Sequence, residues 1–365
     1  MKNAVVLIGP QPPPRHGVSA INEALHVLVA SKGLDVAVVN TAPPSSNRSF
    51  GVRLQRIPVI LRAITQVRRY TRANAGCTCY FSLSGGLGLL YETVLVLVAK
   101  SAGARIVMHH HSFRYVNKFY LPMWGLQRVA GRTATHVILG NTMARLFRTQ
   151  YKAINSVIVL SNSALIEFNP VAVEISGTAK PRTLGLMANL SAAKGLDDFL
   201  EMATISEKQG LGWKFYLAGP FEDSGKAPDY LKRIEALNSI QYLGPVYGEA
   251  KARFFNSIDV FVFPTRYLNE AEPLVILEAM SARKPVIAFD RGCISDILTG
   301  GGGHVIPMGL EFAQAALNVL ATWDREPNGF KVRSEQARSR FKAMREENMQ
   351  SLRTLLEHLG ASTHD

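Results

Sequence analysis

Cysteine is scarce in this chain: Cys77, Cys79 and Cys293 are the three found among 365 residues. Neither their number nor their spacing suits a disulfide framework or a zinc site. The sequence therefore predicts free, buried thiols in a reducing cytoplasm, and it offers no pattern for a resident metal.

Long apolar runs are missing as well. The first run, AVVLIG, is short and is followed by prolines rather than by a cleavage site, so it predicts a buried strand and not a signal peptide. The run at 87–99 is interrupted by Tyr91, Glu92 and Thr93, and it is shorter than the roughly 20 residues that span a bilayer. We expect no transmembrane helix and a cytoplasmic location.

Acidic residues are almost absent from the first 160 positions, which hold 19 Lys and Arg but only Glu23, Asp35 and Glu92. The remaining positions hold 22 basic and 25 acidic residues, so the formal charges of the two parts are +16 and −3. This asymmetry indicates an anionic partner for the first part: nucleic acid, a membrane surface or a phosphorylated acceptor.

Continuous apolar runs alternate with amphipathic segments of helical length. The runs lie at 4–8, 35–39, 78–83, 105–108, 136–139 and 156–160, and then at 183–187, 214–218, 240–243, 260–263, 285–289 and 304–306. Such runs are typical of parallel strands that are buried on both faces, with helices between them. The fold class predicted is α/β, doubly wound.

The alternation breaks once, and the break predicts two domains. Positions 166–182 hold two prolines and a glycine, which indicates a linker. We predict Rossmann-like domains over 1–165 and 183–339. A long charged helix ends the chain, and its part from about 340 to 365 is a candidate to pack back on the first domain. Ligands of such sheets bind in the loops after the strands.

The richest segment is 261–294, FVFPTRYLNEAEPLVILEAMSARKPVIAFDRGCI. A helix is predicted to begin there with Pro273 at its first position. The free amides of Leu274 and Val275 would then form an anion site suited to a diphosphate. Glu270 would lie beside it and accept hydrogen bonds from sugar hydroxyls, and Glu278, about two turns further on, would reach a ribose diol.

This segment resembles the E-x7-E signature of the retaining glycosyltransferases of family 4, with Glu270 and Glu278 in the places of the two acids. The following Ala-Met and Pro-Val-Ile-Ala match as well. The resemblance implies the GT-B fold, in which two Rossmann-like, doubly wound domains face each other across a cleft. It also implies Glu270 as a catalytic residue and a UDP- or GDP-sugar as donor.

A second segment, at 184–203, supports the resemblance. Lys194 precedes Gly195 at the start of an amphipathic stretch and offers a compact positive charge to a phosphate. Members of the family usually carry Gly-Arg-x4-Lys-Gly here, but Asn189 stands at the position of the arginine. Either Lys194 carries the diphosphate charge alone, or Arg266 or Arg15 replaces the missing arginine.

Three further donor contacts are expected. Gly17 lies in the loop 9–19, where a glycine permits close approach of the backbone to a phosphate. Gly219 and Leu243 follow two strands whose loops approach the nucleotide in the family. A GxGxxG sequence is absent, so no dinucleotide fingerprint is present.

Three consecutive histidines follow the run that ends at Met108. Adjacent residues of an extended chain point to opposite faces, so His109, His110 and His111 cannot easily bind one ion. No DxD sequence occurs, and the resemblance implies transfer without a metal or another cofactor, with His110 or His111 near the sugar. Ordinary packing of these histidines is an equal alternative.

The segment 52–72 carries six arginines among apolar residues. As a helix after Pro58 it would place the apolar residues on one broad face and Arg62, Arg68, Arg69 and Arg72 around it. This composition suits a helix on an anionic membrane surface, and it suits a solvated surface helix equally. Nucleic acid is disfavoured, because no recognition motif accompanies the charge.

The functional hypothesis is a retaining glycosyltransferase that moves a hexose-type sugar to a glycan or lipid-linked anionic acceptor, in polysaccharide or glycolipid biosynthesis at the inner membrane face. The first domain would bind the acceptor. Two alternatives stay open: a nucleotide-sugar epimerase, and a non-catalytic protein that binds a sugar nucleotide or a lipid, which the departure at Asn189 would explain.

Overall fold

The computed structural model of the protein describes residues 4–13, 16–42, 56–152, 154–166 and 183–361. The contacts divide the chain into two compact units. Unit 1 comprises Met1–Ile166 together with Arg345–Asp365, and unit 2 comprises Glu167–Met344. Almost all of the linker predicted at 166–182 lies outside the described residues.

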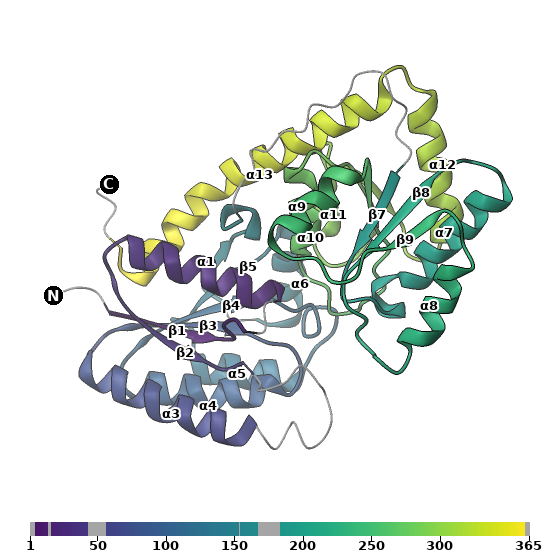
Figure 1. The fold of residues 1–365 in the computed structure, drawn as a ribbon. Coiled ribbons are helices and arrows are strands. Elements are labelled where there is room, and N and C mark those ends of the chain that lie inside the picture. The colour runs from purple at the N-terminus through teal and green to yellow at the C-terminus, as the bar shows by residue number, and fades with distance from the viewer. Residues whose placement is uncertain (1–3, 14–15, 43–55, 153, 167–182, 362–365) are drawn as a thin grey trace. The chain divides into compact units, whose positions relative to one another are not determined.

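Unit 1 is built on a six-stranded parallel sheet with the order β2-β1-β3-β4-β5-β6. Its strands are β1 (Ala4–Gly9), β2 (Asp35–Asn40), β3 (Thr78–Leu83), β4 (Arg105–His110), β5 (Thr135–Ile138) and β6 (Ser156–Val159). Its helices are α1 (Gly17–Ser31), α3 (Arg56–Ala73), α4 (Gly88–Ser101), α5 (Leu121–Ala130) and α6 (Asn141–Gln150). Helices α3, α4 and α5 cover one face of the sheet, and α1 covers the other (Figure 1).

Unit 2 repeats this plan with the order β12-β11-β10-β7-β8-β9. Its strands are β7 (Thr183–Met187), β8 (Lys214–Ala218), β9 (Ile240–Tyr242), β10 (Val260–Phe263), β11 (Val286–Phe289) and β12 (Gly303–Ile306). Its helices are α7 (Leu196–Lys208), α8 (Ala227–Glu235), α9 (Gly248–Ser257), α10 (Leu274–Ser281), α11 (Ile294–Leu298), α12 (Phe312–Arg325) and α13 (Gly329–Leu359), the last of which runs on into unit 1.

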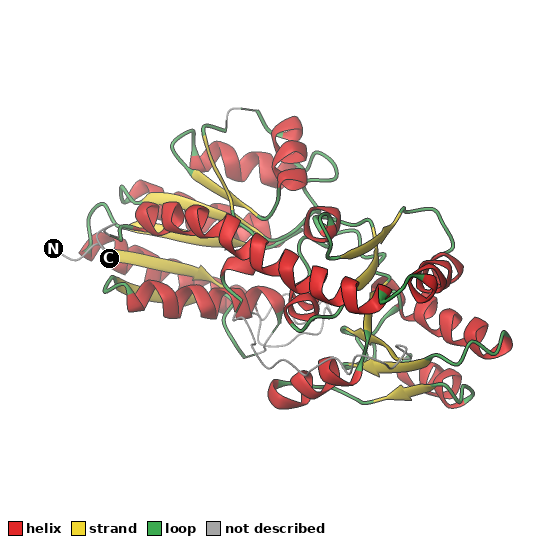
Figure 2. Cartoon of the chain, turned by 90° about the horizontal axis from the view of Figure 1, so that it is seen from above, coloured by secondary structure: helices red, strands yellow, loops and turns green. Residues whose placement is uncertain are grey.

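The predicted α/β class with two doubly wound domains is confirmed, and the strands lie between layers of helices in both units (Figure 2). The apolar runs form strands because parallel pairing buries them on both faces: every residue of β3, β5, β10 and β11 is buried. The three cysteines are also free and buried, as expected. None of the described helices combines the length and apolar character that a membrane span requires.

Each sheet has a point at which the strand order reverses. In unit 1 the reversal falls between β1 and β3, and in unit 2 it falls between β7 and β10. In open α/β sheets the loops after the strands diverge to opposite faces at such a point, and ligands bind there outside the carboxyl ends. The topology therefore directs attention to the loops after β1, β7 and β10.

The end of α13 completes the core of unit 1. The side-chain oxygen of Asn348 accepts a hydrogen bond from the amide of Ser161 at 2.8 Å, and the carbonyl of His358 accepts one from the Thr78 hydroxyl at 3.3 Å. Leu355 and Leu359 are fully buried. This part of the helix is thus a structural element of unit 1 and not a solvated tail.

Replacing Leu355 by Ala should lower the free energy of unfolding of unit 1 by about 2–5 kcal/mol, because it leaves a cavity under the end of α13. Urea denaturation measures the change. Glu357→Ala, an exposed position on the same helix, serves as the control and should change stability by less than about 0.5 kcal/mol. Equal effects of the two substitutions would show that α13 does not belong to the core.

Candidate active site

The two loops at the reversal point of unit 2 meet through an ion pair. Lys194, in the loop after β7, places its Nζ 2.5 Å from Oε2 of Glu270, in the loop after β10. The Thr265 hydroxyl donates to the same carboxylate oxygen at 3.1 Å. The two charged side chains are only 22% and 11% exposed, so the pair is shielded from bulk water and is stronger than a surface ion pair.

Lys194 is also held by aromatic rings. Its Nζ lies 4.7 Å from the ring centroid of Tyr267 and 5.8 Å from that of Phe263. A ring face attracts an ammonium ion, so these contacts fix the charge in place without neutralising it. Thr265 and Tyr267 belong to the site although no sequence motif marked them.

Glycines allow the two loops to approach each other. Gly195 has φ +81°, and a Cβ there would lie 2.2 Å from the carbonyl oxygen of Pro264. Gly292 has φ +57°, and a Cβ there would lie 2.3 Å from the carbonyl oxygen of Glu270. Any other residue at either position would push the backbone of the Glu270 loop away from Lys194.

Helix α10 begins four residues after Glu270, but Pro273 is its N-cap and not its first helical residue. The prediction for Pro273 is therefore corrected: its φ of −66° would suit a helix, whereas its ψ of 115° is extended. Leu274 and Val275 are the first two helical residues, and their amides have no carbonyl four residues earlier within the helix. Both residues are partly exposed, so this helix start can accept an anion.

Glu278, further along α10, is paired as well. Its Oε1 lies 2.6 Å from Nζ of Lys251 on α9. Lys251 escaped the sequence analysis because nothing in the α9 sequence distinguishes it from a solvated lysine. A ligand hydroxyl that binds Glu278 would have to share this carboxylate with Lys251.

The loops after β7, β8 and β9 are joined side by side. Gly219 has φ +120°, and a Cβ there would lie 1.9 Å from the carbonyl oxygen of Ala188, next to the exposed Asn189. The Gly219 amide donates to the carbonyl of Gly244 at 2.8 Å, and Leu243 beside it is 37% exposed. The expected donor contacts Asn189, Gly219 and Leu243 therefore lie at one edge of the sheet.

Arg266 is engaged elsewhere. Its guanidinium binds both carboxylate oxygens of the buried Asp198 at 2.9 and 2.7 Å and lies 4.7 Å from the ring centroid of Phe289. The hydrogen bonds to Asp198 raise the pKa of Arg266 above its usual value. Because a carboxylate already balances its charge, Arg266 is a poor replacement for the arginine missing at Asn189. Arg15 lies outside the described residues.

In unit 1, Gly17 is the first residue of α1, in the loop at the reversal point between β1 and β3. His16 caps the helix: its Nδ1 accepts from the Ser19 amide at 3.3 Å, and its own amide donates to the Ser19 hydroxyl at 2.9 Å. Gly17 thus takes the place expected for it, at a capped helix start after the first strand.

The prediction of a catalytic His110 is corrected by its surroundings. His110 is the last residue of β4 and is fully buried. Its Nδ1 is 3.1 Å from the Tyr115 hydroxyl, its Nε2 is 3.0 Å from Nδ1 of His136, and its ring packs on Phe147. Both ring nitrogens are occupied inside the core, so His110 cannot touch a substrate.

His111 differs from its neighbour. It follows the end of β4, is partly exposed and stacks on His109 with 4.0 Å between ring centroids. Burial of its ring lowers the pKa of His111 to about 3, so it is neutral at physiological pH. Its Nε2 is buried and has no hydrogen-bond partner among the described residues, so of the two candidate histidines His111 is the one with an unused ring nitrogen.

Unit 1 should become less stable in mild acid. Burial lowers the pKa of His136 to about 4 and holds the pKa values of His109 and His110 well below the usual range. In the unfolded chain these histidines take up protons near pH 6.5, whereas in the folded chain they stay neutral. Their contribution to the free energy of unfolding is therefore fully present above about pH 6.5 and decreases as the pH falls toward about 4.

Urea midpoints at several pH values measure this loss. His136→Gln should make the dependence on pH shallower than it is in the wild type. A midpoint that stays constant across this pH range would contradict the assignment of neutral, buried histidines.

Comparison with known proteins finds a family match in unit 2. Residues 181–322 match the family model of the glycosyl transferases group 1. We call these residues the group 1 domain. The group 1 domain contains both loops described above, from Lys194 to Glu278.

Relatives and solved structures extend the comparison. An uncharacterized glycosyltransferase of Haemophilus influenzae is 20% identical over 185 residues, which are 51% of this chain and 50% of that protein. The alpha-D-kanosaminyltransferase of Streptomyces kanamyceticus is 25% identical over 273 residues, 68% of this chain and 67% of that protein. The chain thus spans about half the length of the first of these relatives and two thirds of the second.

The structure of Anabaena HepE in complex with UDP and glucose superposes with a TM-score of 0.68 at 17% identity, over 96% of this chain and 98% of that one. At this identity the likeness establishes the fold. Together with the two six-stranded parallel sheets, it shows that this chain has the GT-B fold.

A site that holds a diphosphate makes opposite predictions for its two charged residues. In such a site Lys194→Met should weaken UDP binding about tenfold or more, because a charge-assisted contact to the diphosphate is lost. Glu270→Gln should strengthen it several-fold, because it releases Lys194 and removes a negative charge beside the phosphates. Titration calorimetry measures both affinities, with Lys208→Met, exposed on α7, as control; changes in the same direction would refute the site.

Proposed function

We propose that this protein is a retaining glycosyltransferase that moves a hexose-type sugar from a nucleoside diphosphate to an acceptor. The observation that carries the proposal is the Lys194–Glu270 pair, which lies at the reversal point of the group 1 domain just before the start of α10. A shielded cation, a helix start and a carboxylate are the three groups that a sugar diphosphate requires.

The donor is a UDP- or GDP-sugar. HepE was crystallised with UDP-glucose, which supports a nucleotide sugar in a protein of this fold. In this chain the diphosphate would bind the amides of Leu274 and Val275 and the Lys194 ammonium, with no cofactor. The exposed Leu243 and the backbone at Gly219 would contact the nucleoside, and Glu278 would hold the ribose.

Donor binding would rearrange the ion pair. Lys194 binds Glu270 in the structure; with donor bound, the lysine would turn to the diphosphate and the carboxylate to the sugar hydroxyls. The acceptor hydroxyl then attacks the anomeric carbon on the face that the diphosphate leaves. A bond forms from the acceptor oxygen to that carbon, the bond from the carbon to the diphosphate oxygen breaks, and the leaving diphosphate takes the hydroxyl proton. Lys194 and the α10 amides stabilise the charge that develops on the leaving oxygen.

The acceptor is an anionic glycan or lipid-linked molecule that binds unit 1. The charge of +16 over the first 160 residues supports an anionic acceptor rather than a neutral one. His111, neutral and only partly exposed just after β4, is the candidate contact for the reacting sugar because its Nε2 has no partner among the described residues. These features fit polysaccharide or glycolipid biosynthesis at the inner face of the membrane.

The test is activity after Glu270→Gln, which preserves the shape of the side chain. Transfer should fall by about 100-fold or more, because the sugar is no longer oriented for attack, while UDP binding persists. A thermal-shift panel of UDP- and GDP-sugars first identifies the donor, and release of nucleoside diphosphate in the presence of acceptor extracts then reports turnover.

Glu235→Ala, an exposed acid at the end of α8, should keep full activity. Near-normal turnover of Glu270→Gln would defeat the assignment of Glu270. Conversion of the donor without any acceptor would favour an epimerase, and tight donor binding without turnover in the wild-type protein would favour a non-catalytic role.

A further inference from the structure

Helix α4 exposes a row of aliphatic side chains to solvent. Leu90, Val94 and Leu97 lie three or four residues apart on one side of the helix, and Leu87 precedes them at the N-cap. The exposed fractions are 58% for Leu87, 51% for Leu90, 43% for Val94 and 55% for Leu97. Single exposed apolar side chains are ordinary on a protein surface, but a continuous row of them on one helix indicates a contact face.

The two neighbouring helices continue this row. Helices α3 and α5 both pack against α4 on the same face of the sheet (Figure 1). Helix α3 contributes Ile57 and Leu61, which are 46% and 60% exposed, and α5 contributes Leu121 and Trp124, which are 64% and 40% exposed. We call this surface, made by the exposed residues of α3, α4 and α5, the three-helix face.

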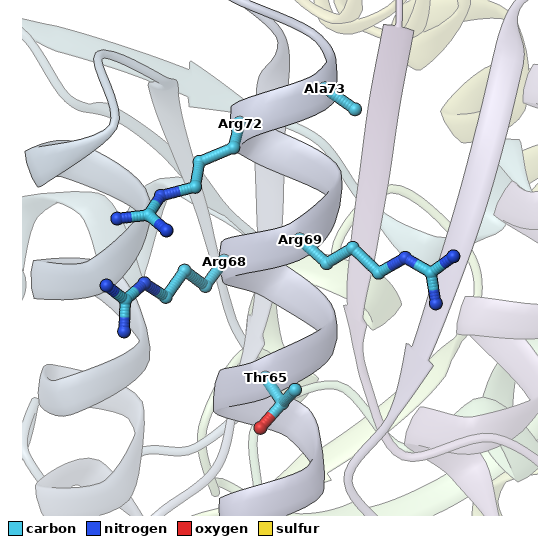
Figure 3. Close-up of a pocket in the computed structure, with 5 residues that line it drawn as sticks. All are labelled: Thr65, Arg68, Arg69, Arg72 and Ala73. Carbon is cyan, nitrogen blue, oxygen red and sulfur yellow. The ribbon is translucent and has the colours of Figure 1, made fainter.

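Basic side chains border the apolar residues. On α3, Arg68 and Arg72 lie one turn apart and point to the same side, whereas Arg69 points the opposite way (Figure 3). With Thr65 and Ala73 these arginines line an open pocket of about 650 Å³. Arg68, Arg69 and Arg72 have no acidic partner among the residues that the structure describes, and on α5 Arg128 stacks 4.7 Å from the Trp124 ring centroid.

Negative charge is missing from the three-helix face. Positions 56–132 hold eleven Lys and Arg side chains but a single acid, Glu92. The Glu92 carboxylate accepts a hydrogen bond from the Ser84 amide at 2.9 Å and points away from solvent. The exposed charged side chains of this face are therefore all positive.

We propose that the three-helix face is a docking surface for a lipid bilayer that contains anionic phospholipids. The helices would lie in the plane of the interface, with the α4 leucines and Trp124 at the boundary of headgroups and acyl chains. The α3 arginines would reach the lipid phosphates while their aliphatic stems stay in the apolar layer.

Other partners fit this surface less well. Nucleic acid would match the arginines, but it offers nothing apolar to a row of leucines and valine. A second copy of the chain would match the leucines, but a symmetric interface would bring two positive faces together. A bilayer with anionic lipid satisfies both features at once. The inference is independent of the proposed transfer reaction, since docking needs neither donor nor catalytic residues.

Co-sedimentation of the full chain with vesicles tests the proposal. The protein should pellet with vesicles of phosphatidylcholine mixed with phosphatidylglycerol and remain in solution with phosphatidylcholine alone. Arg68→Gln with Arg72→Gln should lower the partition coefficient about 25-fold, at roughly fivefold for each arginine. Leu90→Ser with Leu97→Ser should lower it at least about tenfold.

Matched controls come from unit 2. Lys208→Gln with Lys232→Gln removes the same charge from exposed positions on α7 and α8, and Leu310→Ser with Val332→Ser removes exposed aliphatic side chains. Both controls should bind as the wild type does. All variants are compared by melting temperature, so a folding defect is seen separately from a loss of binding.

Tryptophan fluorescence gives a second readout. Trp124 is exposed, whereas Trp213 and Trp323 are 6% and 4% exposed. Brominated acyl chains should quench Trp124, and this quenching should vanish in Trp124→Phe. The proposal would be overturned if the α3 or α4 variants pelleted as the wild type does, or if bound vesicles did not quench Trp124. Binding to nucleic acid without binding to anionic vesicles would also overturn it.

Discussion

The arrangement of unit 2 depends on one close contact between opposite charges, which links the loop after β7 to the loop after β10. Lys194 and Glu270 are 76 positions apart, and the reversal of strand order is what brings their loops together. A glycine on either side of the contact permits the approach, and an aromatic ring holds the lysine. The strand order thus brings the two loops together, and the side-chain contacts then hold them in place.

The charges of the site are balanced internally, and this has a chemical consequence. Glu270 pairs with Lys194, and Lys251 pairs with Glu278, so both carboxylates have a partner within the protein. In the proposed function, a diphosphate would compete for Lys194 and a sugar would compete for Glu270. A ligand that brings both groups satisfies both partners at once, which favours an intact sugar nucleotide over its fragments.

Much of this was accessible from the sequence. Continuous apolar runs located the strands to within one or two residues in most cases, because burial on both faces favours apolar residues at most positions of a parallel strand. The motif residues Glu270 and Lys194 were identified separately, but their mutual pairing was not, since it depends on which strands are neighbours. Thr265 and Lys251 were missed because a single threonine or lysine carries no pattern.

The histidines and Arg266 show what a one-dimensional pattern leaves open. The sequence placed the end of β4 at Met108, but the strand continues to His110, and this decides which ring enters the core beside His136 and Phe147. The sequence suggested Arg266 as a free cation for the diphosphate, but the structure pairs it with Asp198, which lies 68 positions earlier. Exposed apolar residues on α4 were equally hidden, because the helical spacing alone does not say which face is covered.

The most direct test of the account is a double-mutant cycle on the affinity for UDP, with Lys194→Met, Glu270→Gln and the combined variant measured by calorimetry. If the diphosphate takes Lys194 from Glu270, the gain from Glu270→Gln will be present with the lysine and largely absent without it. The same gain in both backgrounds would mean that the two side chains act independently, and the central claim would be wrong.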